Sequence, residues 1–169
     1  MKTIIGVMGP GEKQSQEADL ECAYEVGKIV AGTGAVLLCG GMTGTMESAA
    51  KGAQAVGGIV VGIGSTMDKR DLNEYVDIPI MTGMHAGRNF INIVSSDLLI
   101  FVSVGSPGTL SELAFAIQLE KPVVIIRGSK KLKDYIEAFK SPSIYFTTSV
   151  SELEKEVKKI IKIFTSGRR

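Results

Sequence analysis

Apolar positions along the chain follow two alternating patterns. Short apolar runs rich in β-branched residues predict strands at 3–8, 35–39, 58–63, 97–104, 122–126 and 144–147. Longer segments with a helical period lie between them and predict helices at 15–31, 45–56, 84–95, 109–119, 132–139 and 150–164. Because strands and helices alternate, the pattern predicts a Rossmann-like, doubly wound parallel sheet with helices on both faces, a three-layer α/β/α architecture.

One connection breaks this alternation. Between residues 64 and 82 the sequence is irregular, and only 75–80 has the composition of a strand. Long connections of this kind often cover functional sites. The 169 residues, 44% of them hydrophobic, suffice for one well-filled core. We therefore expect a single domain over residues 1–169.

Charge and cysteine content narrow the classes of partner. The formal net charge is +1, and the lysines of the last helix alternate with glutamates, so neither a nucleic-acid partner nor a membrane is expected. No apolar run has the length of a membrane span. Cys22 and Cys39 lie in apolar stretches without metal-ligand spacing, which predicts buried thiols and a cytoplasmic protein.

Glycines gather where the predicted strands end, and in a doubly wound sheet those ends carry the ligand site. The first strand leads into a loop containing Gly9, whose glycine spacing is not that of a dinucleotide-binding loop. No acidic residue follows the second strand to hold a ribose. The sequence thus favours a phosphate-bearing ligand over a nicotinamide cofactor.

The loop at 40–45 contains Gly40, Gly41, Gly44 and Thr45. Its backbone N–H groups are placed to meet an anion at the positive end of the following helix. A tight turn with Thr45 as the helix N-cap explains the same residues equally well. We keep both interpretations at this loop.

The loop at 105–109 gives a stronger signal, because it follows a very apolar strand. The spacing of Thr109 and Glu112 predicts a capping box, but this leaves Gly105, Ser106 and Gly108 unexplained. A first-turn carboxylate is stabilised by the helix dipole, so Glu112 is expected to be ionised. An ionised Glu112 beside a phosphate site would contact ribose hydroxyls or stabilise a developing cation.

The helix predicted at 84–95 begins with a residue that violates a local rule. Arg88 lies near the positive end of this helix, which is unfavourable unless an anion or Glu112 lies opposite. Its apolar residues Phe90, Ile93 and Val94 are expected to face the core. His85 is the only histidine, so it is interpreted as structural, and neither a metal site nor a catalytic triad is predicted.

Together these motifs resemble the Lonely Guy family, often labelled possible lysine decarboxylases, and more closely its branch of molybdenum cofactor carrier proteins. The G-G-x-x-G-x-M-E-A-A-like stretch corresponds to residues 40–50, and an altered P-G-G-x-G-T-x-x-E signature corresponds to 104–112. Arg88 and Asp97 match positions of the family pattern. The likeness extends from residue 4 to about 126.

The resemblance implies hydrolysis of the N-glycosidic bond of nucleoside 5'-monophosphates, not lysine decarboxylation, with no required cofactor. Glu112 and Arg88 would be the catalytic residues, and the two glycine loops would bind phosphate. The motif M-H-x-R-K, however, appears here with one extra residue and with Asn89 in place of the lysine, and the second signature lacks its leading proline. These departures are typical of the carrier-like branch. They support the alternative of a non-catalytic carrier or sensor of molybdenum cofactor or a related phosphorylated ligand.

The carrier-like branch also implies homo-oligomers. We expect a homodimer or homotetramer in which the alanine-rich helix at 45–55 and the apolar helix at 90–94 pack across a two-fold axis.

Overall fold

The computed structural model describes residues 1–139, 141 and 143–166. Within them, seven strands form one parallel sheet in the order β4-β3-β2-β1-β5-β6-β7. The strands are β1 (Ile4–Met8), β2 (Val36–Cys39), β3 (Val60–Gly64), β4 (Ile78–Met81), β5 (Leu98–Val102), β6 (Val123–Ile126) and β7 (Ile144–Thr147). The predicted Rossmann-like α/β fold is confirmed.

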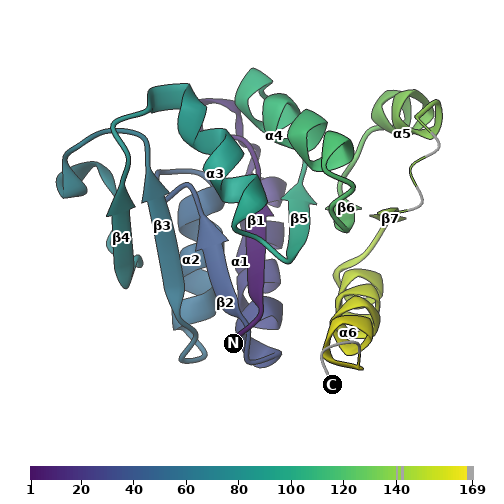
Figure 1. Cartoon of the computed structure of the whole chain (residues 1–169), viewed down its shortest axis with the longest axis horizontal. Coiled ribbons are helices and arrows are strands. Elements are labelled where there is room, and N and C mark those ends of the chain that lie inside the picture. Colours follow the sequence, from purple (N-terminus) through teal and green to yellow (C-terminus); the bar gives the residue numbers. More distant parts are fainter. Residues whose placement is uncertain (140, 142, 167–169) are drawn as a thin grey trace.

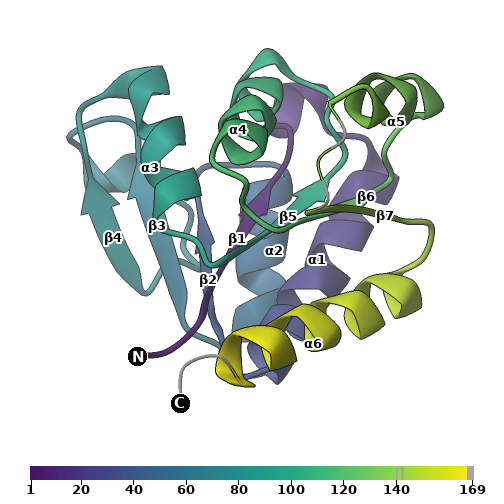
Figure 2. The same ribbon diagram turned by 45° about the vertical axis from the view of Figure 1, so that its right-hand side comes forward.

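Helices cover both faces of this sheet (Figures 1 and 2). They are α1 (Glu17–Gly32), α2 (Thr45–Gln54), α3 (Arg88–Val94), α4 (Pro107–Gln118), α5 (Lys130–Glu137) and α6 (Val150–Ser166). The apolar residues of α1, α2 and α6 belong to one core cluster, and those of α3, α4 and α5 belong to the other. The molecule thus has the three predicted layers. Among the described residues, no helix is both long and apolar enough to cross a membrane.

The sheet is buried most deeply at its centre. All five residues of β5 are fully buried, and β5 pairs with β1 on one side and β6 on the other. A strand covered by helices on both faces needs a continuous apolar run, which is what the sequence of β5 provides. This rigid centre positions the loops that follow β1 and β5.

The direction of chain progression reverses between β1 and β5. From β1 the chain adds β2, β3 and β4 toward one edge, and it then returns to place β5 on the other side of β1. The loops that follow β1 and β5 therefore leave the carboxyl ends of these two adjacent strands in different directions. Ligands bind at this switch point in doubly wound folds.

Helices α1 and α2 approach each other closely through two glycines. A Cβ on Gly27 would lie 2.0 Å from the carbonyl oxygen of Ala49, and one on Gly52 would lie 2.0 Å from that of Tyr24. The small residues Ala49 and Ala53 are completely buried in this packing. The alanine-rich face of α2 is covered by α1 of the same chain, so this face is not available to a second copy. Packing of the remaining surface of α2 across a two-fold axis stays a prediction.

Helix α3 presents its residues differently from the prediction. Ile93 is buried as expected, but Phe90 and Val94 are 43% and 42% exposed. Its other buried residues are polar, namely Arg88, Asn89 and Asn92. The polar face of α3 points inward because it meets α4 and the loops at the carboxyl end of the sheet. Two apolar residues of α3 therefore face outward.

The irregular connection at 64–82 contains a short 3-10 helix (Lys69–Asp71) and the edge strand β4. The strand expected at 75–80 begins three residues later, at Ile78. Asp77 precedes it and accepts hydrogen bonds from the backbone N–H of Val60 and from Gln54. These side-chain contacts fix the position at which pairing with β3 begins.

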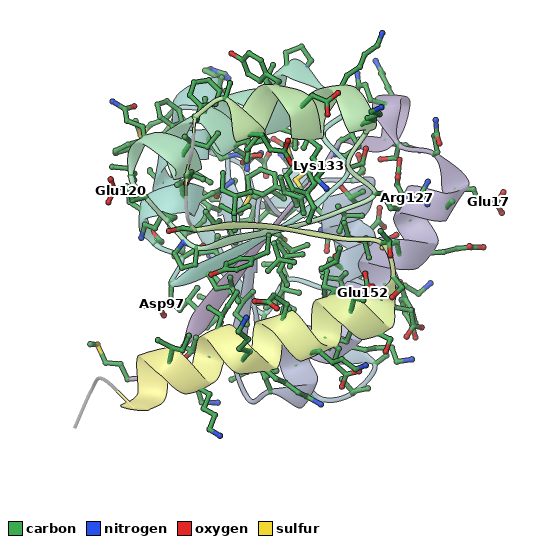
Figure 3. The ribbon with its side chains drawn as sticks, turned by 90° about the vertical axis from the view of Figure 1, so that its right-hand side faces the viewer. Glu17, Asp97, Glu120, Arg127, Lys133 and Glu152 are labelled. Atoms are coloured by element: carbon green, nitrogen blue, oxygen red, sulfur yellow. The ribbon has the colours of Figure 1, made fainter. Side chains whose placement is uncertain are left out.

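Two charged residues, Arg127 and Asp97, lie at opposite ends of the sheet (Figure 3). At the carboxyl end, Arg127 follows β6 and forms an ion pair with Asp19 at 2.6 Å. At the opposite end, Asp97 precedes β5 and accepts a hydrogen bond from the backbone N–H of Ile4. Asp97, which matches the family pattern, lies at the end of the sheet away from the loops that follow β1 and β5.

Candidate functional site

A pocket of about 130 Å³ lies where the loops after β1 and β5 diverge. It is lined by Met8, Gly9, Gly11, Met46, Arg88, Asn89, Ser106, Gly108, Thr109 and Glu112. These residues come from β1 and its loop, from the first turns of α2 and α3, and from the first two turns of α4 with its N-cap. Four segments far apart in the sequence, around residues 9, 46, 88 and 108, therefore form one site.

The structure brings six of the predicted site residues to the pocket wall. They are Gly9, Arg88, Ser106, Gly108, Thr109 and Glu112. Five others lie outside the wall, namely Gly40, Gly41, Gly44, Thr45 and Gly105. The loop at 40–45 has a different relation to the pocket, which its contacts explain.

Gly40 supports Arg88 and does not line the pocket. A Cβ on Gly40 would lie 2.1 Å from Nη1 of Arg88, so the guanidinium rests directly on the backbone of this glycine. Gly41 and Gly44 have φ values of 70° and 77°, a region that favours glycine. The glycines of this loop shape the turn and leave space for Arg88.

Thr45, at the end of the loop after β2, hydrogen-bonds the loop after β1. Its hydroxyl donates to the carbonyl of Pro10 at 2.7 Å, and its backbone N–H donates to the same oxygen. It is the first residue of α2, and Gly44 is the N-cap. The hydroxyl that we expected either to bind phosphate or to cap the helix is thus engaged with the β1 loop.

Helix α4 begins two residues earlier than predicted, and its cap is Ser106. The Ser106 hydroxyl accepts from the backbone N–H of Thr109, with Pro107 as the first helical residue. Glu112 lies in the second turn, so the predicted capping box of Thr109 and Glu112 is wrong. Pro107 suits the first helical position because it fixes φ and needs no hydrogen-bond acceptor.

Gly108 leaves open space at the positive end of α4. A Cβ placed there would lie 3.8 Å or more from its neighbours, and the residue does not have a positive φ. In the part of the chain that the structure describes, its backbone N–H has no hydrogen-bond partner. Neither packing nor backbone conformation requires glycine here, so the backbone at Gly108 stays open to the pocket.

Arg88 is a buried cation without an anion held against it. The side chain is 7% exposed, and Nε has no hydrogen-bond partner among the described residues. Nη2 donates only to the sulfur of Met42, at 3.7 Å, and thioether sulfur is a weak acceptor. Burial lowers the pKa of Arg88, and the nearby Glu112 opposes this shift. A buried charge of this kind is costly unless an anion compensates it.

Glu112 is a carboxyl group held largely out of water. It is 6% exposed, and burial raises its pKa to about 7, with the Asn92 hydrogen bond and Arg88 acting in the opposite direction. The expectation that the helix dipole keeps it fully ionised is therefore wrong. Desolvation dominates because Glu112 lies beyond the first turn of α4, where the dipole is weaker.

Two asparagines on α3 complete the site, and the sequence interpretation did not select either. Asn92 is fully buried and donates to Oε1 of Glu112 at 2.8 Å. Asn89 lines the pocket and donates to the hydroxyl of Ser111 at 3.1 Å. Asn92 lies four residues after Arg88, so a search for polar residues on the inner face of α3 would have found it.

His85 and the cysteines lie outside this chemistry. His85 is exposed in a 3-10 turn with φ 49°, and the described residues contain no group of three or more His, Cys, Asp or Glu side chains that could hold a metal ion. Cys22 and Cys39 are buried and free, as predicted. Burial raises the pKa of both thiols to about 11.

The chemistry available in the pocket suits an anion. Arg88 supplies a permanent positive charge, and the start of α4 supplies an N–H donor with the helix dipole behind it. Glu112, with its raised pKa, can present a protonated oxygen as a further donor. The pocket thus combines several hydrogen-bond donors in a partly desolvated space.

Comparisons with known proteins agree with the fold. A molybdenum cofactor binding protein from Rippkaea orientalis is 39% identical with a TM-score of 0.88, covering 95% of this chain and 98% of that one. The molybdenum cofactor carrier protein from Chlamydomonas reinhardtii is 35% identical with a TM-score of 0.89, covering 95% and 99%. An uncharacterized protein from Archaeoglobus fulgidus is 43% identical over 141 residues, which are 79% of this chain and 90% of the relative. These similarities support a ligand-binding or carrier role.

The family is settled by a match over most of the chain. The model of the SLOG cluster4 family matches residues 2–157. The chain belongs to the SLOG cluster4 family, on the branch of the Lonely Guy superfamily that resembles molybdenum cofactor carriers.

Proposed function

We propose that this protein is a non-catalytic carrier or sensor that holds a phosphorylated ligand, molybdenum cofactor or a related compound, by its phosphate group. The observation that carries the proposal is Arg88, a buried guanidinium beside a pocket with no protein anion in contact among the described residues. A bound phosphate would supply the missing charge and accept from Arg88 and from the N–H of Gly108. Charge-assisted bonds of this kind are among the stronger ones in proteins.

The small volume of the pocket supports binding of the ligand by its phosphate end. Sites that enclose a drug-sized ligand measure about 300–1,000 Å³, whereas this pocket measures about 130 Å³. It accommodates the phosphate and adjacent atoms, and the remainder of the ligand would extend out of the pocket. A carrier needs this kind of access, because its ligand must be released intact.

The relatives support molybdenum cofactor as the candidate ligand. Two structures at 35–39% identity that cover nearly the whole chain are a molybdenum cofactor binding protein and a molybdenum cofactor carrier protein. Asn89, where the enzyme motif has lysine, hydrogen-bonds Ser111 on α4 and so fixes the pocket wall. This residue has a place in a binding site without any catalytic role.

Analysis of the protein as purified tests the ligand. Wild-type protein from cells that make molybdenum cofactor should contain molybdenum and release a pterin on acid oxidation, measured by elemental analysis and fluorescence. Arg88→Met should lose both, because it keeps the aliphatic stem and removes the charge. Arg70→Met is the matched control, since Arg70 is exposed and pairs with Asp68 outside the pocket. Equal loading of wild type and the Arg88 variant would contradict the proposal.

A second candidate function is hydrolysis of nucleoside 5'-monophosphates, because Glu112 and Arg88 line the same pocket. A carboxylate there would stabilise an oxocarbenium-like transition state. The raised pKa of Glu112 leaves this carboxylate partly protonated at neutral pH. A panel of nucleoside monophosphates should be assayed for release of free base, with Glu112→Ala as control. Glu112-dependent release at ordinary enzymatic rates would replace the carrier proposal.

A further inference from the structure

Met42 is the side chain that touches the charged end of Arg88. Its sulfur accepts hydrogen bonds from Nη2 of Arg88 and from the hydroxyl of Ser65, both at 3.7 Å. Two donors from different loops thus converge on one thioether sulfur. The residue is 37% exposed, so small molecules in solvent can reach it.

The backbone of Met42 is fixed by its neighbours. The side-chain amide of Asn73 donates to the carbonyls of Gly41 and Met42 at 2.9 and 2.8 Å. Gly41 itself adopts a φ of 70°. The loop therefore holds the backbone from which the sulfur reaches Nη2 of Arg88, and the residue as a whole remains 37% exposed.

The other methionines do not combine these properties. Met67 and Met84 are more exposed than Met42, but neither sulfur has a hydrogen bond with a pocket residue within the described chain. Met8 accepts from Asn92, but it is buried beneath the pocket. Met46 lines the pocket, but among the described residues Met42 is the exposed methionine whose sulfur accepts a hydrogen bond from Arg88.

We infer that Met42 is a site of reversible oxidation that controls how strongly Arg88 binds an anion. The inference rests on the proposed anion-binding role of the pocket. A hydroperoxide transfers one oxygen to the sulfur: the O–O bond breaks, an S–O bond forms, the thioether loses two electrons, and the peroxide leaves as water or alcohol. Methionine sulfoxide reductase reverses the reaction.

The sulfoxide changes the partner that Arg88 meets. A thioether is a weak acceptor, whereas the oxygen of a sulfoxide is polar and accepts strongly. Because Nη2 and the Ser65 hydroxyl already point at the sulfur, an oxygen added there meets both donors. The oxidised side chain then competes with a bound anion for the guanidinium. Loss of one charge-assisted hydrogen bond predicts roughly tenfold weaker binding.

The test compares oxidised and reduced forms of each protein by calorimetric titration with inorganic phosphate. Wild type treated with hydrogen peroxide should bind phosphate roughly tenfold more weakly than before treatment. Peptide mass mapping should show that the loss follows formation of Met42 sulfoxide, and methionine sulfoxide reductase should restore binding. In Met42→Leu the ratio of oxidised to reduced affinity should be close to one. In Met67→Leu, which removes a methionine that is 87% exposed, the ratio should match wild type.

The outcomes separate this inference from the proposed function. If reduced wild-type protein binds no phosphate, the proposed function fails. If reduced protein binds phosphate and protein with Met42 fully oxidised binds equally well, the oxidation inference fails alone. It also fails if Met42 stays reduced while Met67 and Met84 oxidise, or if peroxide weakens binding by Met42→Leu as much as binding by wild type. The time course in wild type needs no variant and keeps the test decisive should Met42→Leu not fold.

Discussion

Glu112 and Arg88 illustrate how single residues set the properties of the pocket. Arg88 keeps its charge because a guanidinium does not deprotonate in proteins, whereas burial raises the pKa of Glu112 to about 7. An anion entering between them repels an ionised Glu112 and favours its protonated form. Binding of phosphate is therefore expected to weaken as pH rises through about 7, because Glu112 must then take up a proton when the ligand binds.

Replacing Glu112 with glutamine should change how stability depends on pH. The folded-state pKa is raised from 4.5 to about 7, so the stabilisation by the protonated form is complete below pH 4.5 and is lost as pH rises through about 7. A shift of this size corresponds to about 3 kcal/mol. Glu112→Gln keeps an acceptor for Asn92, and above pH 7 it should be more stable than wild type by up to that amount.

Urea unfolding of both proteins at pH 4.5 and pH 8 measures this difference. Glu21→Gln, on the exposed face of α1, is the control and should follow wild type. A stability difference between wild type and Glu112→Gln that is the same at both pH values would show that Glu112 does not titrate as described.

The sequence predicted the chemistry of the pocket better than its individual contacts. Arg88 could be selected because it violates the local rule for a helix start, and Glu112 because it follows a glycine-rich loop and matches the family signature. Gly108 could be selected because the capping pattern does not explain it. Asn92 was missed because an asparagine in an apolar helix looks unremarkable until Glu112 is known to lie opposite. Thr45 was expected to contact phosphate or to cap the helix, because its bond to Pro10, 35 positions earlier, has no signature in the local sequence.

At the scale of elements, the start of α4 and the loop at 40–45 have different roles in the pocket. The start of α4 meets the pocket, and the loop supports Arg88 from below through Gly40. Helix boundaries were predicted to within two residues except at α3, which begins four residues later than predicted, at Arg88. The orientation predicted for α3 was also wrong. Apolar residues were assumed to face inward, and the polar face of α3 points to the site instead.

The close packing of α1 on α2 gives a prediction about stability. Gly52→Ala should destabilise the fold by roughly 1–3 kcal/mol, because the new methyl group would meet the carbonyl oxygen of Tyr24 and force the helices apart. Gly32→Ala, at the end of α1, is the matched control, since nothing lies within 4 Å of its Cβ position. Thermal unfolding of both variants checks this, and equal melting temperatures would contradict the packing argument.

At the scale of the whole molecule, the sequence predicted the class of sheet, because buried strands alternating with helices allow few other folds. The order of strands depends on where each helix crosses the sheet, and local patterns do not report that. The start of the edge strand β4 was predicted three residues too early. Its start depends on long-range contacts of Asp77 with Gln54 and Val60, and local patterns do not report such contacts either.

The outer surface of α3 and α4 supports the prediction of a homo-oligomer. Phe90 and Val94 on α3 are exposed, as are Leu110 and Leu119 on α4, and Phe90 packs edge-on against Phe115 of α4 with ring centroids 5.2 Å apart. Exposed large apolar side chains on two helices in contact are typical of an interaction site. We expect a second copy of the chain to cover it in a symmetric dimer or tetramer.

Light scattering after size exclusion measures the assembly. Wild type should elute as an oligomer, and Phe90→Glu combined with Val94→Glu should shift it toward monomer. Ile163→Glu, an exposed apolar position on α6 on the opposite face of the sheet, is the control and should leave the assembly unchanged. A monomeric wild type at micromolar concentrations would refute this prediction.

The central claim, that Arg88 holds the phosphate of a ligand, is tested most directly by calorimetric titration with inorganic phosphate. Wild type should show saturable binding, and Arg88→Met should bind at least tenfold more weakly, because the charge-assisted hydrogen bonds are lost. Since Arg88 has no protein anion in contact among the described residues, the variant should unfold at a temperature no lower than wild type. Equal phosphate affinity in the two folded proteins would contradict the account.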